Sequence, residues 1–318
     1  MMDIIITGCS KSGKTSIRKV VFDKKYPNET IFNEPTNKPE NIQVESLGYS
    51  YLNLTEFPSS FSSNNMIEYD KYLNTCQALI FIIDTQNTLN PQYEYFKNII
   101  SLFNKYNDIY LWVFFHKTDN LDVAQTDYNE QRAELKSKIK QIVKGAKLDD
   151  LDVNYYATSI YNSSLFEAFS QIFQNILPQN KNLSSLIDNL SINCRFEKAF
   201  LFDVYNKFYL AVDCSPNKAQ HYEMCTDIID LALDVSGIYG NQKEDEEIDS
   251  YFDENSICSI KLNSKVNDDS KDILFLKFIH KNFALIAIIN EDIYERNNLL
   301  DYNINMFKQG VKTILKFK

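Results

Sequence analysis

The most constraining feature of the sequence is the run Gly8-Cys9-Ser10-Lys11-Ser12-Gly13-Lys14-Thr15, which fits the pattern G-x-x-x-x-G-K-[ST] at every position. The stretch Asp3–Thr7 before it predicts a strand, and Lys14–Phe22 after it predicts a helix. A glycine-rich turn between strand and helix directs backbone N–H groups and the helix N-terminus toward one point, where phosphate oxygens bind. The chain holds only 7 glycines, so a chance match is rare, and the sequence predicts a phosphate-binding loop.

Two residues of this loop carry specific chemistry. We expect Lys14 to place its charge against the β- and γ-phosphates of a nucleotide, and the Thr15 hydroxyl to ligate Mg²⁺. The other residues predicted to contact the nucleotide here are Gly8, Ser10, Lys11, Ser12, Gly13 and Ser16. The loop therefore predicts a nucleoside triphosphate bound with Mg²⁺.

A second signal, His116-Lys117-Thr118-Asp119, ends the predicted buried strand Ile109–His116. Small GTPases carry Asn-Lys-x-Asp at this place, so His116 departs from the pattern while Lys117 and Asp119 keep it. A carboxylate there accepts two hydrogen bonds from the guanine edge, a donor pair that adenine lacks, and the lysine stem lies over the base. Ser159 and Ile160, after the predicted strand Asp152–Thr158, fit the last base-contacting loop. The pattern predicts guanine rather than adenine.

The first part of the chain alternates between strand and helix patterns, which predicts a mostly parallel sheet covered by helices. Buried strands are expected at Ala78–Asp84 and Ile109–His116, and a further strand at Asp152–Thr158. Helices are expected at Tyr93–Asn104, Asn129–Lys144 and Ser164–Leu177. Pro178 ends this region. We therefore place an α/β nucleotide-binding domain at residues 1–180.

After Pro178 the pattern changes. Gln179–Ser185 reads as a linker running into a helix. Strands are expected at Lys198–Val204, Phe208–Asp213, Ile257–Leu262, Ile273–Ile279 and Ala284–Asn290, and helices at Lys218–Val235 and Asn298–Leu315. The charged runs Lys243–Asp249 and Ser264–Lys271 read as solvated loops. This order predicts an α+β domain with one antiparallel sheet at residues 181–318.

Composition disfavours several classes of protein, among them nucleic-acid-binding, membrane-spanning and secreted proteins. The chain has 43 acidic and 33 basic residues and a net charge of −10, which disfavours general binding to nucleic acid or anionic membranes. No apolar run approaches the roughly 20 residues that span a bilayer, and the N-terminus does not resemble a signal peptide. The 6 cysteines are scattered, which favours a reduced intracellular chain, and the 3 histidines give little support to a zinc site.

Several stretches resemble the Rag GTPases, specifically their C/D branch, over nearly the whole chain. They are Arg18–Phe32, His116–Asp119, Thr158–Phe169, Phe196–Pro216 and Asp234–Gly240. The resemblance implies a Ras-like G domain that binds GTP or GDP with Mg²⁺, followed by a roadblock-type domain.

The resemblance also implies partners. It implies an obligate heterodimer with a Rag A/B-type subunit, formed through the roadblock-type domains. Such dimers are held on lysosomes or vacuoles by a separate scaffold complex and signal amino-acid sufficiency to the target-of-rapamycin kinase complex. We expect a cytoplasmic chain that is recruited peripherally to the membrane without inserting into it.

The two switch segments complete the family pattern, and the second one departs from it. Thr36 fits the first-switch threonine that completes Mg²⁺ coordination, with Thr30 as a second candidate. At the second switch the family has Asp, Gly and Gln where this chain has Glu56, Ser59 and Ser60. A serine cannot orient the attacking water as a glutamine does, so the resemblance implies slow hydrolysis.

Two other readings stay open. The chain could be a catalytically inactive scaffold subunit that binds nucleotide without hydrolysing it. A P-loop ATPase or small-molecule kinase is disfavoured, because Asp119 reads guanine and no arginine-rich lid segment is evident.

Overall fold

The computed structural model describes residues 2–32, 36–46, 50–59, 71–103, 106, 109–120, 126–148, 151–239, 256–262, 271–280, 282–295 and 297–316. Ser60 and the predicted loops at 243–249 and 264–270 lie outside these residues. The chain divides into two compact units, with Ala168 ending the first and Phe169 opening the second part of the chain. The domain boundary expected at residue 180 stays a prediction.

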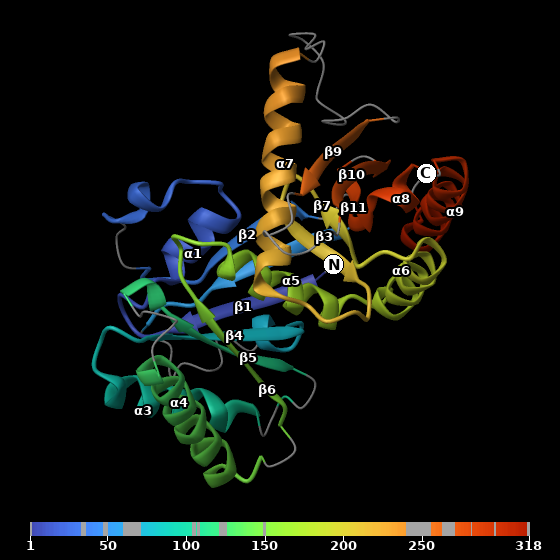
Figure 1. The fold of residues 1–318 in the computed structure, drawn as a ribbon. Coiled ribbons are helices and arrows are strands. Elements are labelled where there is room, and N and C mark those ends of the chain that lie inside the picture. The colour runs from blue at the N-terminus through green and yellow to red at the C-terminus, as the bar shows by residue number, and fades with distance from the viewer. Residues whose placement is uncertain are drawn as a thin grey trace, which may run out of the picture. The chain divides into compact units, whose positions relative to one another are not determined.

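The first unit contains a six-stranded sheet in the order β2-β3-β1-β4-β5-β6 (Figure 1). Only the β2–β3 pair is antiparallel; the other neighbours are parallel. The strands are β1 (Met2–Gly8), β2 (Glu40–Ser46), β3 (Ser50–Glu56), β4 (Ala78–Asp84), β5 (Tyr110–His116) and β6 (Val153–Thr158).

Helices cover this sheet. They are α1 (Lys14–Val21), α3 (Leu89–Phe103) and α4 (Thr126–Gly145), with short 3₁₀ turns η1 (Pro27–Thr30) and η3 (Thr118–Asn120). Helix α5 (Ser164–Ile176) contains the division between the two units, which falls after Ala168. Figure 1 shows α3 and α4 on one face of the sheet and α1 on the other. Side chains of α3 and α4 form one buried cluster with residues of β1, β4 and β5.

The central strands explain where the site forms. Every residue of β4 is buried, as is every residue of β5 except Tyr110, because helices shield both faces of a parallel sheet. The carboxyl ends of β1, β4, β5 and β6 meet at one edge, since these strands run in the same direction. The loops that follow these strands therefore lie together, which is where open α/β sheets bind ligands.

The second unit contains a five-stranded antiparallel sheet in the order β8-β7-β11-β10-β9. Its helices α6 and α9 pack against each other. The elements are α6 (Asn180–Cys194), β7 (Lys198–Asp203), β8 (Phe208–Val212), α7 (Ala219–Tyr239), β9 (Ile257–Leu262), β10 (Asp272–His280), β11 (Phe283–Asn290), α8 (Glu291–Tyr294) and α9 (Asn297–Leu315).

The predicted fold classes of both halves are confirmed, and some local predictions are wrong. Gln179–Ser185 is not a linker, because α6 already begins at Asn180 and buries Leu183, Ile187 and Leu190 on one side. The long helix α7 continues past Val235 to Tyr239. The strands β2 and β3 were not expected from the sequence.

All 6 cysteines are free. Among the described residues, no helix has the length and apolar character needed to cross a membrane. The same residues hold no group of three or more His, Cys, Asp or Glu side chains that could bind a metal ion by themselves.

Candidate nucleotide-binding site

The phosphate-binding loop lies between the end of β1 at Gly8 and the start of α1 at Lys14. Gly13 has a φ of 99°, and a Cβ there would lie 2.8 Å from Cδ2 of His116. A Cβ on Gly8 would lie 2.7 Å from the carbonyl oxygen of Ile82 in β4. Both positions therefore require glycine, one for its backbone conformation and both for close approach to neighbouring strands.

Lys14 closes the loop onto itself. Its side chain is buried, and Nζ donates hydrogen bonds of 2.8 Å to the carbonyl oxygens of Gly8 and Cys9. Burial lowers the pKa of Lys14 to about 8, and the charges of Glu56 and Cys9 oppose this shift. A bound phosphate would supply the anion that this partly desolvated ammonium group lacks.

The loop lines a cavity of about 600 Å³. The structure brings nearly all of the predicted site residues into this cavity: Ser10, Lys11, Ser12, Gly13, Lys14, Thr15, Ser16, Thr36, Glu56, His116, Lys117, Asp119 and Ile160. Gly8 and the buried Ser159 are not among the lining residues. Their assigned roles in nucleotide binding stay predictions. Ser59 of the second switch also lines the cavity, and the lining residues that were not expected from the sequence are Ile31, Gln86 and Tyr161.

At one end of the cavity, Asp119 lies exposed on η3 after β5. Its Oδ1 accepts a hydrogen bond of 3.0 Å from the hydroxyl of Ser159, which follows β6. The same Ser159 oxygen accepts from the backbone N–H of Tyr161. Ser159 thus fixes the carboxylate that is expected to read guanine, and it links the two loops that would hold the base.

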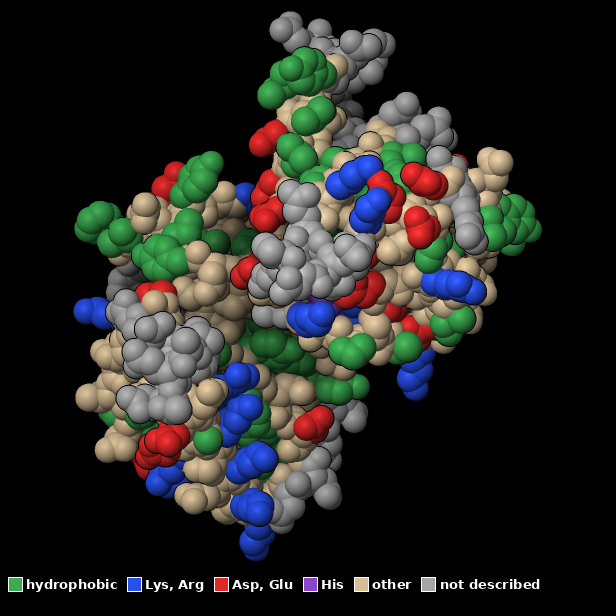
Figure 2. All heavy atoms as spheres, viewed as in Figure 1, with side chains coloured by type: hydrophobic (Ala, Val, Ile, Leu, Met, Phe, Trp, Pro, Cys, Tyr) green, Lys and Arg blue, Asp and Glu red, His purple; other side chains and the backbone are tan. Residues whose placement is uncertain are grey.

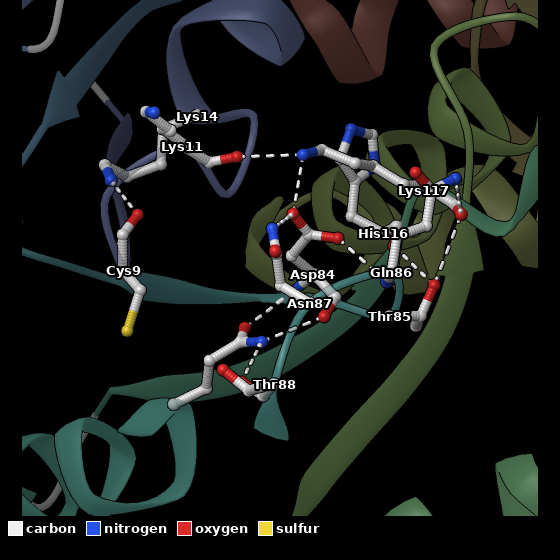
Figure 3. A network of polar contacts seen from close by, with 11 residues as sticks. Cys9, Lys11, Lys14, Asp84, Thr85, Gln86, Asn87, Thr88, His116 and Lys117 are labelled. Atoms are coloured by element: carbon white, nitrogen blue, oxygen red, sulfur yellow. Dashed lines mark hydrogen bonds and ion pairs between the residues drawn. The ribbon is translucent and has the colours of Figure 1, made fainter. Parts of the chain in front are cut away.

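Lys117 is fixed by a carboxylate that the sequence reading missed (Figure 3). Its Nζ lies 2.5 Å from Oδ2 of Asp84 and donates a 2.9 Å hydrogen bond to the carbonyl oxygen of Lys11. Asp84 is buried at the end of β4 and also accepts from the backbone N–H of Gln86 and the amide of Asn87. The sequence does contain one indication of a functional role for Asp84, because this ionisable residue ends the apolar run ALIFIID.

His116 is buried between the base side and the phosphate loop. Its Nδ1 lies 3.0 Å from the hydroxyl of Thr158, and its ring packs against Gly13. Burial lowers the pKa of His116 to about 4, with a smaller contribution from the charge of Lys117. The imidazole is therefore neutral at physiological pH and acts as a packing and hydrogen-bonding group.

The opposite end of the cavity gathers three oxygens. Oε1 of Glu56 accepts hydrogen bonds from the hydroxyls of Thr15, at 2.5 Å, and Thr36, at 2.7 Å. Thr30, the second candidate for the switch threonine, instead donates to the carbonyl oxygen of Pro27. Hydroxyl and carboxylate oxygens are ligands that Mg²⁺ accepts, so these residues fit the ion that the family pattern implies.

Comparison with known proteins agrees with this geometry. The family model described as "Gtr1/RagA G protein conserved region" matches residues 3–229. Ras-related GTP-binding protein C of Mus musculus is 36% identical over 315 residues, covering 98% of this chain and 77% of that protein. GTP-binding protein gtr2 of Schizosaccharomyces pombe is 32% identical over 315 residues, covering 98% and 97%.

A relative named GTR1 matches less of the chain than the protein C and gtr2 sequences do. GTP-binding protein GTR1 of Saccharomyces cerevisiae is 26% identical over 219 residues, which is 67% of this chain and 68% of that protein. The similarity to the protein C and gtr2 sequences extends through both units. The chain therefore belongs to the Gtr1/RagA G protein family, as a GTP-binding Rag GTPase of the C/D branch.

Proposed function

We propose that the chain is the guanine-nucleotide-binding regulatory subunit of a Rag-type heterodimer, and that it hydrolyses GTP slowly. The observation that carries this proposal is one cavity with Lys14 at its phosphate end and Asp119 at its base end. The glycine loop and the Asp119–Ser159 pair come from different parts of the sequence. Their convergence supports a ligand with both phosphates and a guanine base.

Each end of the cavity has its own task. The backbone N–H groups of residues 8–15 and the ammonium group of Lys14 bind phosphate oxygens and stabilise charge that develops on them. Asp119 accepts from the guanine edge while Ser159 holds its orientation. Thr15 and Thr36 would hold Mg²⁺, which neutralises charge on the β- and γ-phosphates when bound.

Slow hydrolysis follows from what the second switch lacks. A water that attacks the γ-phosphate must be oriented, and the glutamine that does this in the family is replaced by Ser60. Ser59 replaces a glycine, and its Cβ limits the backbone conformations that bring its N–H group to the γ-phosphate. Binding groups are thus kept while the groups that assist turnover are changed.

The second candidate function is an inactive scaffold subunit that holds a nucleotide only to complete the heterodimer. The contact of Glu56 with both Thr15 and Thr36 favours it. These hydroxyls are held by the chain's own carboxylate, so the first switch depends less on a γ-phosphate for its position.

We infer the partner surface from the second unit. Exposed apolar side chains follow one another along the C-terminal half of α7: Leu231, Val235, Ile238 and Tyr239. Figure 2 shows hydrophobic side chains gathered on this part of the helix. The adjacent edge strand β9 exposes Ile257. An apolar helix face beside the edge strand of a sheet suits a second roadblock-type sheet. The proposed occupant is a Rag A/B-type subunit.

The proposed setting is the cytoplasmic face of the lysosome or vacuole. There the heterodimer would be held by a scaffold complex and would signal amino-acid sufficiency to the target-of-rapamycin kinase complex. Membership of the C/D branch supports this proposal. The net charge of −10 favours recruitment through a protein scaffold over direct binding to anionic lipid.

Single-turnover phosphate release tests the enzymatic part. The full chain is loaded with radiolabelled GTP and Mg²⁺, freed of excess nucleotide, and followed for hours beside Lys14→Ala. We expect the wild-type chain to load and release phosphate slowly, and Lys14→Ala to load poorly. Loading without release would favour the scaffold function. Displacement of GDP by ATP at similar concentration would contradict guanine binding and revive an ATPase or kinase.

Co-purification tests the partner. The chain is co-expressed with a Rag A/B-type subunit, and Ile238→Asp is compared with Tyr302→Asp, an exposed position on α9 of the same unit. We expect Ile238→Asp to lower the recovered heterodimer at least tenfold and Tyr302→Asp to leave it unchanged. Equal recovery for the two variants would contradict an α7 interface.

A further inference from the structure

Three oxygens at the switch end of the cavity are spaced like the ligands of one metal ion. Oε1 of Glu56 lies 2.5 Å from Oγ1 of Thr15 and 2.7 Å from Oγ1 of Thr36, and the two threonine oxygens are 3.2 Å apart. Mg²⁺ binds oxygens at about 2.0–2.1 Å in an octahedron, so adjacent ligands lie about 3 Å from each other. The triangle formed by the three oxygens approximates one face of that octahedron.

The backbone and one cation fix where the Glu56 carboxylate can go. Glu56 ends β3 and pairs with Ile6 of β1, so its Cα is set by the sheet. Its side chain is fully buried, and Nε of Arg18 lies 3.2 Å from Oε2. Arg18 therefore holds one oxygen of the carboxylate and leaves Oε1 to the two hydroxyls.

Side-chain length decides whether the carboxylate reaches the metal. The family pattern places an aspartate at this position, and glutamate is longer by one methylene, about 1.5 Å. From the same Cα, an aspartate would end short of the two hydroxyls and act through a water molecule. Glu56 already contacts both hydroxyls directly.

We propose that Glu56 is a direct ligand of the bound Mg²⁺, beside Thr15 and Thr36, in place of a water molecule. The inference rests on the proposed function, because it concerns the metal that accompanies the nucleotide. A carboxylate bound directly adds negative charge at the ion and removes one exchangeable water. Mg²⁺ bound through a carboxylate and substrate phosphates is an arrangement that other phosphate-handling sites use.

Counting the waters on the metal tests this proposal without measuring turnover. The full chain is loaded with Mn²⁺ and the non-hydrolysable analogue guanosine 5′-(β,γ-imido)triphosphate. Broadening of the Mn²⁺ electron paramagnetic resonance signal in ¹⁷O-enriched water then counts bound waters. Two phosphate oxygens, Thr15, Thr36 and Glu56 leave room for about one water, whereas Glu56→Asp leaves room for about two.

Two further variants act as controls. One separates the length of the Glu56 side chain from its charge, and the other shows whether shortening a nearby glutamate has the same effect. Glu56→Gln keeps the length, so we expect about one water and roughly tenfold weaker Mn²⁺ binding. Glu40→Asp shortens the other glutamate paired with Arg18, at 3.1 Å, which is not in contact with Thr15 or Thr36. We expect this matched control to keep the wild-type water count.

The outcomes distinguish this inference from the proposed function. Equal water counts in the wild-type chain and Glu56→Asp would overturn direct ligation by Glu56, while guanine-nucleotide binding would stand. Nucleotide bound without Mn²⁺ would overturn it as well. A wild-type chain that binds neither GDP nor the analogue would overturn both the inference and the proposed function.

Discussion

The two ends of the nucleotide cavity differ in how closely they keep the family pattern. At the base end, Asp119 and Lys117 are kept and each has a polar partner, Ser159 and Asp84. At the metal end, Glu56 replaces an aspartate and binds Thr15 and Thr36 itself. The proposed function therefore assigns recognition of the nucleotide and its turnover to different residues, which makes the two separable by mutation.

One cavity can combine tight nucleotide binding with slow hydrolysis. Contacts that hold ground state and transition state equally lower the dissociation constant without accelerating chemistry. The base-end contacts are of this kind, whereas the proposed role of the phosphate loop also includes stabilising charge that develops in the transition state. Loss of the groups that orient water costs turnover alone, so nucleotide binding can remain tight while hydrolysis becomes slow.

Among the predicted variants, we expect Asp119→Asn to weaken binding of the guanine base most. The amide replaces an acceptor with a donor, so it mismatches the guanine edge and suits xanthine, which carries an oxygen at that edge. We expect GDP affinity to fall about 100-fold, since two charge-assisted hydrogen bonds are lost, and xanthosine diphosphate to bind better. Competition titration with a fluorescent nucleotide measures both. Unchanged GDP affinity would mean that Asp119 does not read the base.

The phosphate end was predictable because its information is local. The loop from Gly8 to Thr15, its strand and its helix are contiguous, and each residue type has a direct physical task. Asp119 and Ser159 were singled out because each follows a predicted strand, and parallel strands end at the same edge of the sheet. The fold classes followed from the same alternation of strand and helix patterns.

Other features depend on contacts between distant residues, and one sequence does not reveal them. The Asp84–Lys117 pair joins the ends of β4 and β5, and nothing in either segment alone specifies it. The contact of Glu56 with Thr36 depends on where a polar loop returns to the sheet. Strands β2 and β3 were missed although they alternate in the way typical of half-buried strands, with Ile42 and Val44 in one and Leu52 and Leu54 in the other. Two apolar residues in a polar surrounding are a weaker signal than the continuous apolar runs of β4 and β5.

A pH series tests whether the base end is tightly packed. Free histidine titrates near 6.5 and folded His116 near 4, so the unfolded chain binds more protons between these values. Stability of the first unit should therefore fall as pH drops through this window, by about 2 kcal/mol between pH 7 and pH 5. His116→Asn should remove this part of the pH dependence.

Fluorescence of Trp112, the only tryptophan, reports unfolding of this unit because the residue lies in β5. Urea titrations at pH 7 and pH 5 compare the wild-type chain with His116→Asn. An equal loss of stability in both proteins would show that other groups carry the acid sensitivity.

Asp84→Asn tests the partner of Lys117. The variant keeps the shape but removes the charge that lies 2.5 Å from the lysine ammonium group. We expect GDP to dissociate about ten times faster, because Lys117 would no longer be held over the base. The matched control is Asp3→Asn, which removes a carboxylate bound to Asn53 on the same sheet, away from the cavity. Equal rates for both variants would assign Asp84 a purely structural role.

The smallest expected effect lies at the metal end, where Ser59→Gly restores the family residue. Glycine allows the backbone conformations that bring the N–H group of position 59 to a γ-phosphate, and the gain is offset in part by the entropy of ordering glycine. We expect the preference for the non-hydrolysable GTP analogue over GDP to rise about threefold, while GDP affinity itself stays unchanged. Calorimetric titration with both nucleotides measures the ratio. A ratio that does not move would show that Ser59 has no influence on γ-phosphate recognition, and that the difference between the two ends of the cavity is carried by Glu56 and Ser60.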